Sequence, residues 1–142
     1  MFYWRLNQKA KKFVLRIWIY CAEVNWVVNN FETRLQQVHI LSHAPPGDNT
    51  VVTGWAKNWA KVVDRFANTI SAQFYGHTHN DQFELWYDTE TNSVPINVGY
   101  VTPSVTTFTG LNPSYRIYTV DGPYEGASMV SKNVNPYSMH AL

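Results

Sequence analysis

Residues 38–47 have the sequence VHILSHAPPG, in which a short apolar and β-branched run meets an abrupt stop. Such a run is typical of a buried strand, and two prolines followed by a glycine prevent a strand or a helix from continuing. We therefore predict a strand over residues 38–42 that ends at a loop beginning with His43.

The segment after this loop has the periodicity of an amphipathic helix that starts near Gly54. Its apolar residues recur at helical spacing: Trp55, Trp59, Val62, Val63, Phe66 and Ile70. Residues 72–75 (AQFY) predict a second buried strand, which ends at the loop GHTH over residues 76–79. The order strand, helix, strand predicts a right-handed crossover, which places the loops after both strands at the same edge of a sheet.

The rest of the chain is predicted to be mostly β. Further runs rich in β-branched and aromatic residues occur at 83–87, 94–100, 104–109 and 115–121, and turn-forming sequences separate them. The predicted class is therefore α/β, or more narrowly α+β. We divide the chain into a basic N-terminal extension (1–36), a domain (37–130) and a tail (131–142).

Composition excludes several classes of protein. A hydrophobic fraction of 45% over 142 residues is enough for one buried core. The net charge of +1 provides no field that would attract nucleic acid, so we predict no nucleic-acid partner. The single cysteine, Cys21, cannot form an internal disulfide.

The N-terminal extension contains a short apolar run over residues 13–20. Arg16 interrupts this run, which argues against a signal peptide. Together with Glu23 and Asn25 it also interrupts any window long enough to span a membrane. An amphipathic helix and sequence foreign to the domain both remain open for this extension.

Three histidines should meet at the predicted sheet edge. His43 follows the first strand, and His77 and His79 lie in the loop after the second. Catalytic groups in open α/β sheets collect beyond the carboxyl ends of strands, and imidazole is the commonest metal ligand. The three together favour a metal site, with ordinary turn or core histidines as the alternative. His39 precedes the loop, and we assign it a structural role.

Several stretches occur in a characteristic order: VHILSHAPPG at 38–47, QFYGHTH at 73–79, PSVTT at 103–107 and GLNPSYR at 110–116. In this order they resemble the C-terminal half of acid sphingomyelinase-like phosphodiesterases over residues 37–129. The resemblance implies part of a calcineurin-like metallophosphoesterase β-sandwich with two zinc ions. It further implies hydrolysis of the phospholipid sphingomyelin to ceramide and phosphocholine, and an extracellular or lysosomal location.

By position, the resemblance makes His43 and His77 ligands of one zinc ion and His79 a ligand of the other. Paired metal ions in such sites lower the pKa of a bridging water for attack on phosphorus. Phe108 would line the mouth of the substrate site, with an ordinary core position as an equal alternative. No residue of this chain is assigned as the general acid.

Three motifs that supply the family's other ligands are absent from the 142 residues. They are Asp-x-His, Gly-Asp-x-x-Asp and Gly-Asn-His-Glu, the last of which also contributes the general acid. Three neutral imidazoles do not balance two zinc ions, so we expect partial metal binding and no turnover by this chain alone. Asp48 and Asp81 are candidate substitute ligands, although each also fits a turn or surface carboxylate.

Two functions therefore stay open. The first is a fragment of a zinc phosphodiesterase that depends on the missing N-terminal half, which would also cover an otherwise exposed hydrophobic strand edge. The second is a non-catalytic relative that binds lipid headgroups or a partner, or acts as a regulator.

Overall fold

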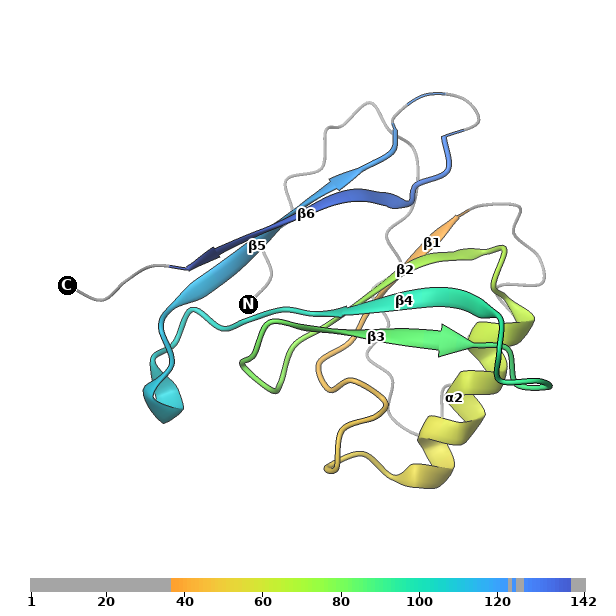
Figure 1. The fold of residues 1–142 in the computed structure, drawn as a ribbon, viewed down its shortest axis with the longest axis horizontal. Helices are drawn as coiled ribbons and strands as arrows, with labels where there is room; N and C mark the ends of the chain where they lie inside the picture. The colour runs from red at the N-terminus through yellow and green to blue at the C-terminus, as the bar shows by residue number, and fades with distance from the viewer. Residues whose placement is uncertain (1–36, 123, 125–126, 139–142) are drawn as a thin grey trace.

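The computed structural model describes residues 37–122, 124 and 127–138. The predictions for the extension over 1–36 therefore lie outside the described residues. Figure 1 shows a four-stranded sheet, one helix against it and a separate two-stranded hairpin. This mixed arrangement agrees with the predicted α+β class.

The first elements are those that the sequence predicts. β1 (Val38–Leu41) is followed by α2 (Thr53–Arg65) and β2 (Ile70–Tyr75). β1 and β2 pair in parallel, with Leu41 opposite Phe74. The loops after the two strands therefore start at the same edge of the sheet, which confirms this part of the prediction.

Two further strands complete the sheet. β3 (Gln82–Tyr87) and β4 (Pro95–Val101) give the strand order β1-β2-β4-β3, in which β4 is parallel to β2 and antiparallel to β3. β3 is thus an edge strand, and it exposes Phe83 and Leu85. An edge strand with exposed apolar side chains is a surface on which another chain segment can pair.

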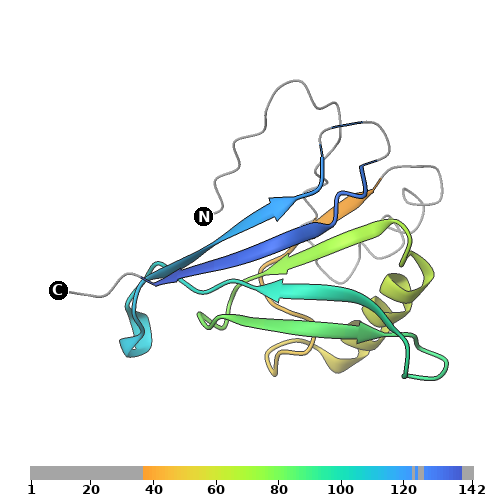
Figure 2. The same cartoon turned by 45° about the horizontal axis from the view of Figure 1, so that its top comes forward.

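The hairpin consists of β5 (Ser114–Val120) and β6 (Ser131–Ser138), paired antiparallel. Phe74 of β2 packs edge-on against Tyr118 of β5, with 4.8 Å between ring centroids. The neighbouring Gln73 instead bonds Trp59 of α2. Because successive side chains of a strand point to opposite faces, α2 and the hairpin lie on opposite faces of the sheet (Figure 2).

Two predictions about this region differ from the structure. Residues 104–109 form no strand, and the only regular element there is the 3-10 turn η1 (Phe108–Gly110). Thr109 and Gly110 both have positive φ, which a strand does not accommodate. β6 was not predicted, and it occupies 131–138 of the segment assigned as a tail.

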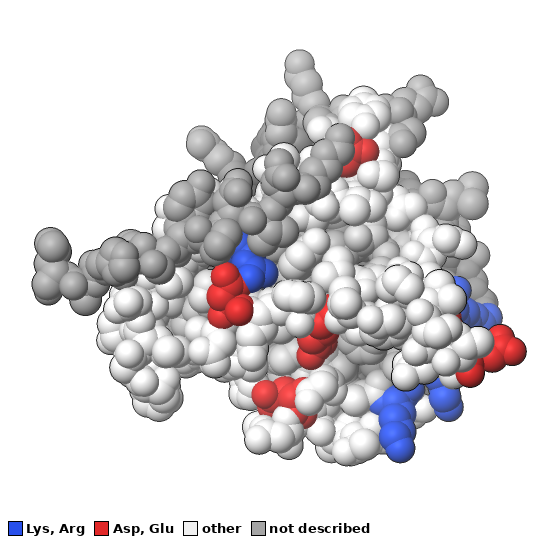
Figure 3. Space-filling model, viewed as in Figure 1, with Lys and Arg blue, Asp and Glu red and all other residues white. Residues whose placement is uncertain are grey.

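The core lies between α2 and the sheet. Its buried side chains come from β1, from α2 and the residue that follows it, and from the start of β2: Val38, Ile40, Trp59, Val62, Val63, Phe66 and Ile70. The apolar helix stripe thus faces the sheet, as its spacing predicts. On the face drawn in Figure 3, the charged groups of the described residues are scattered and form no large patch of one sign.

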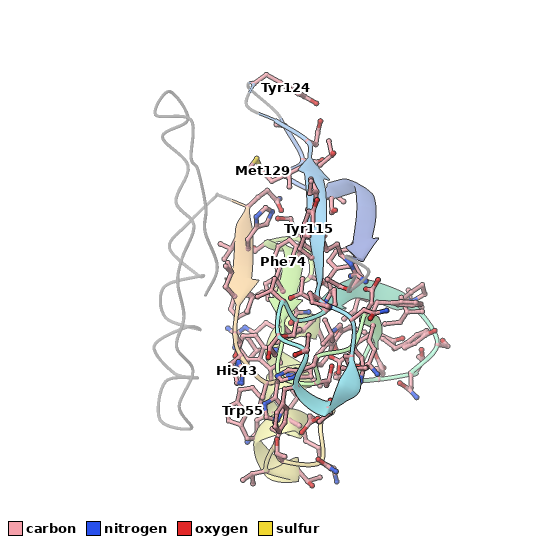
Figure 4. All side chains as sticks on the ribbon, turned by 90° about the vertical axis from the view of Figure 1, so that its left-hand side faces the viewer. His43, Trp55, Phe74, Tyr115, Tyr124 and Met129 are labelled. Carbon is pink, nitrogen blue, oxygen red and sulfur yellow. The ribbon has the colours of Figure 1, made fainter. Side chains whose placement is uncertain are left out.

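His39 has the structural role that we predicted. Its side chain is buried, and its Nε2–H donates to the carbonyl oxygen of Met129 at 2.7 Å, because a carbonyl can only accept. This bond connects β1 to the segment just before β6, and Figure 4 shows Met129 at the end of the sheet opposite to His43.

Acid should destabilise the protein through His39. Burial lowers the pKa of His39 below its ordinary value of 6.5, although the bond to Met129 acts in the opposite direction. The unfolded state therefore binds a proton on His39 more readily than the folded state does. The contribution of neutral, buried His39 to the free energy of unfolding is present above about pH 6.5 and is lost as the pH falls below it.

Urea denaturation at about pH 7.5 and about pH 5.5 measures this effect above the range in which most carboxylates titrate. His39→Gln keeps an N–H donor for Met129 but cannot become charged. We expect the wild-type midpoint to fall more than that of the variant. Equal falls in both proteins would show that His39 is not responsible.

Candidate functional site

The candidate site lies where the loops after β1 and β2 meet. The N–H of Ser42 donates to the carbonyl oxygen of Phe74 at 3.0 Å, and the N–H of Gly76 donates to the carbonyl oxygen of His43 at 2.9 Å. These two bonds extend the parallel ladder into both loops. They bring the side chains of His43 and His77 next to each other, as the sequence predicts.

The two imidazole rings of this histidine pair are in contact. Nδ1 of His77 lies 3.1 Å from Nε2 of His43, and the rings meet edge-to-face with centroids 4.9 Å apart. The backbone of His77 has a φ of 74°, in the left-handed region that residues other than glycine rarely adopt. Such a conformation costs about 1–3 kcal/mol, and residues that adopt it are enriched at functional sites.

His79 does not join this pair in a metal-binding group. Its φ is also positive, at 64°, and its ring packs edge-on against Phe108, with 6.0 Å between centroids. Among the residues that the structure describes, no group of three or more His, Cys, Asp or Glu could hold a metal ion. The metal roles of the histidines therefore stay predictions.

Phe108 lies on η1 and is 68% exposed. An ordinary core position, the alternative considered from the sequence, does not fit this exposure. Val105 in the same loop is 70% exposed. The ring of Phe108 is thus presented to solvent beside His79, and its role at a substrate site stays a prediction.

Asp48 contacts the histidine pair mainly through Thr50. Its Oδ1 accepts hydrogen bonds from the backbone N–H of Thr50 at 2.8 Å and from the Thr50 hydroxyl at 2.5 Å. These two bonds are the main reason that the pKa of Asp48 is below its ordinary value. The hydroxyl oxygen of Thr50 lies in turn 3.0 Å from Nε2 of His77, closer than Oδ1 of Asp48 at 3.6 Å.

Sequence reasoning missed Thr50. The signal that could have found it is the spacing of Asp48 and Thr50, because Asp side chains commonly bond the backbone two residues further on. It also missed Glu84 of β3, which accepts a hydrogen bond from the backbone N–H of Gly47 in the same loop. Burial raises the pKa of Glu84, and Asp48 nearby acts in the same direction.

The other proposed substitute ligand, Asp81, lies in an ion pair with Arg116 of β5. The side chain of Arg116 is only 8% exposed. Asp81 therefore connects the loop after β2 to the hairpin. Its exposed position fits the alternative interpretation of Asp81 as a turn or surface carboxylate.

Comparison with known proteins supports the interpretation of the sequence. Sphingomyelin phosphodiesterase 2 of Caenorhabditis elegans is 41% identical over 138 residues, which cover 84% of this chain and 22% of that protein. The sphingomyelin phosphodiesterases of Bos taurus and Homo sapiens are each 43% identical over 122 residues, covering 84% of this chain and 19% of each relative. Over this region, the chain is similar to sphingomyelin phosphodiesterases of the acid sphingomyelinase-like family.

The resemblance inferred from the sequence motifs is thus confirmed. No family model matches the chain. The chain spans about a fifth of the length of these relatives, at 19–22%. None of the helices that the structure describes has the length and apolar character needed to cross a membrane.

Proposed function

We propose that this chain contributes part of the active site of a zinc-dependent sphingomyelin phosphodiesterase with a calcineurin-like metallophosphoesterase fold. The reaction would convert sphingomyelin and water to ceramide and phosphocholine in an extracellular or lysosomal compartment. The observation that carries the proposal is the contact between His43 and His77 at the carboxyl edge of two parallel strands. The names of the relatives support the substrate.

His43 and His77 are the residues that would hold one zinc ion. Neighbouring ligand atoms of a tetrahedral zinc site with bonds of about 2.0–2.1 Å are about 3.4 Å apart. The facing nitrogen atoms of the pair are 3.1 Å apart, which suits ligands of one ion. Both imidazoles are uncharged as ligands and zinc takes four, so this donor set fits the ion only in part.

Bound zinc would supply a water of lowered pKa for attack on phosphorus. The residues of this chain would bind the zinc ions and orient the substrate. His43 and His77 would hold their lone pairs toward one point, and we assign His79 to the second ion. Phe108, exposed beside His79, would contact substrate at the mouth of the site.

Completing the site requires further groups. The three family motifs that would provide them do not occur in the 142 residues. The exposed apolar residues Phe83 and Leu85 on the edge strand β3 support a dependence on further chain segments. We therefore propose that the chain alone has no phosphodiesterase activity.

We expect the purified 142-residue chain with added zinc to release no phosphocholine from sphingomyelin in mixed detergent micelles above background. The physical reason is that two or three imidazoles neither balance the charge of two zinc ions nor provide a general acid. An active sphingomyelin phosphodiesterase serves as positive control. Zinc-dependent turnover that His77→Ala abolishes would contradict the claim of an incomplete site.

A non-catalytic lipid-binding relative is the second candidate function. The observation that favours it is the exposed pair Val105 and Phe108, which would remain usable without a complete metal site. Cosedimentation with sphingomyelin vesicles in the presence of a zinc chelator tests it. Binding that Phe108→Ser abolishes would support this candidate, and absence of binding would exclude it.

A further inference from the structure

Four side chains at the site form a continuous series of contacts. Oδ1 of Asp48 lies 2.5 Å from the hydroxyl oxygen of Thr50, which lies 3.0 Å from Nε2 of His77. Nδ1 of His77 then lies 3.1 Å from Nε2 of His43. The two interior groups, the Thr50 hydroxyl and the His77 ring, contact a partner on each side, so their neighbours constrain the positions of their protons.

The carboxylate of Asp48 determines which group donates and which accepts in each of these hydrogen bonds. An ionised carboxyl group only accepts hydrogen bonds, so the hydroxyl proton of Thr50 must point to Asp48. The hydroxyl oxygen then has only lone pairs to offer to His77. Since two facing lone pairs would repel at 3.0 Å, Nε2 of His77 must carry a proton and donate it. Neutral imidazole has one N–H, so Nδ1 of His77 is left as an acceptor.

The backbone holds this arrangement in place. Asp48 bonds not only the hydroxyl of Thr50 but also its N–H, at 2.8 Å. The N–H of Asp48 donates to the carbonyl oxygen of Pro45, and the N–H of Val51 donates to that of Asp48, each at 3.0 Å. Thr50 is therefore fixed within a hydrogen-bonded turn, and its hydroxyl is directed by the fold.

We propose that Asp48 and Thr50 are positioning residues that hold the neutral tautomer of His77 with its proton on Nε2. In this tautomer Nδ1 of His77 carries a lone pair and no proton, which is the state that a metal-ligating imidazole nitrogen requires. The inference about the proton stands on the contacts themselves, whereas its consequence for zinc rests on the proposed function. It also gives Asp48 a task other than that of a substitute metal ligand.

Nitrogen-15 NMR of the histidine side chains measures the proton position directly. We would record long-range proton–nitrogen correlations of the metal-free chain at about pH 8, where ordinary imidazoles are neutral. The wild type should show a protonated Nε2 and an unprotonated Nδ1 for His77. A wild-type His77 with its proton on Nδ1 would overturn the proposal.

Thr50→Val keeps the shape of the side chain but removes the hydroxyl. We expect the ratio of the two tautomers of His77 to fall by about tenfold, because one directed hydrogen bond is lost. Thr50→Ser restores the hydroxyl and should restore the wild-type ratio. An unchanged ratio in Thr50→Val, with a native backbone amide spectrum, would show that Thr50 does not position His77.

Asp48→Ala provides a second test that does not depend on Thr50→Val folding. Without the carboxylate, the hydroxyl of Thr50 is free to donate to Nε2, so a mixture of tautomers is expected. The matched control is Thr89→Val, because Thr89 bonds Asp64 through both its N–H and its hydroxyl, as Thr50 bonds Asp48. The same loss of a threonine hydroxyl there should leave the His77 signals unchanged.

Zinc affinity separates this inference from the proposed function. If both hold, Thr50→Val should weaken zinc binding by about 10–100-fold, and Thr50→Ser should restore it. Suppose that the wild-type chain binds no zinc, but Thr50→Val still changes the tautomer ratio of His77. This result upholds the positioning role and counts against the proposed function. Zinc binding at the histidine pair with no tautomer shift overturns the positioning role alone.

Discussion

Gln73→Leu should lower the free energy of unfolding by about 2–6 kcal/mol, because the change leaves two buried donors without an acceptor. Gln73 is fully buried, and its Oε1 accepts from Nε1 of Trp59 at 3.1 Å and from the hydroxyl of Tyr75 at 2.7 Å. Its Nε2 donates to Oδ1 of Asn97 at 3.1 Å. One amide thus satisfies polar groups from α2, β2 and β4.

Tyr75 remains a donor in this network at any ordinary pH. Its side chain is buried, and burial raises the pKa of its hydroxyl. Leucine at position 73 would leave both this hydroxyl and the Trp59 indole N–H buried without a partner. The cost of each unsatisfied group is about 1–3 kcal/mol, which sets the expected total.

Urea denaturation of the full chain at pH 7 measures the change. A variant that combines Gln73→Leu with Tyr75→Phe removes one of the abandoned donors, so it should recover part of the lost stability. If Gln73→Leu unfolds within about 0.5 kcal/mol of the wild type, the network does not stabilise the fold as we infer.

The sequence predicted the elements that local pattern defines. The apolar spacing of Trp55, Trp59, Val62 and Val63 marks one helix face, and these residues pack in the core against the sheet. Ile70, which the same spacing assigned to the helix, is instead the first residue of β2, because α2 ends at Arg65. The prolines at 45 and 46 end the first strand, so the order strand, helix, strand could be inferred. Parallel pairing then placed His43 and His77 at one edge without any knowledge of side-chain contacts.

What the sequence did not reveal depends on contacts distant along the chain. β6 contains Asn133, Asn135 and Pro136, residue types that are depleted in strands, and it forms a strand because it pairs with β5. The run 104–109 has β-branched residues but pairs with no strand in the part of the chain that the structure describes, so composition alone was misleading there. Tertiary pairing outweighs β propensity in both cases.

The sequence predicted that His43 and His77 lie close together, but not the other contacts that these side chains make. Topology gave the histidine pair, but the path of the loop between Gly47 and Val51 decides that Thr50 comes between Asp48 and His77. Asp81 follows His79 closely in sequence, yet it pairs with Arg116 of the hairpin. Neither partner choice can be obtained from spacing alone.

His77→Ala should lower zinc affinity on the order of 100-fold or more, because it removes a ligand. Loss of a residue that only hydrogen-bonds a ligand already lowers metal affinity by about 10–100-fold. The binding should be weak and close to one ion per chain in the wild type, since the histidine pair supplies only part of a four-ligand set. His43→Ala should have an effect of similar size, because its Nε2 lies 3.1 Å from Nδ1 of His77, close enough for both nitrogens to bind one ion.

Isothermal titration calorimetry of the 142-residue chain with zinc is the most direct test of the proposed metal site. His39→Gln is the matched control, because it removes a histidine whose Nε2 bonds Met129 away from the pair. We predict zinc binding that His77→Ala and His43→Ala each abolish and that His39→Gln preserves. Zinc binding that survives both alanine substitutions, or a wild-type chain that binds no zinc, would contradict the assignment of His43 and His77 to a metal centre.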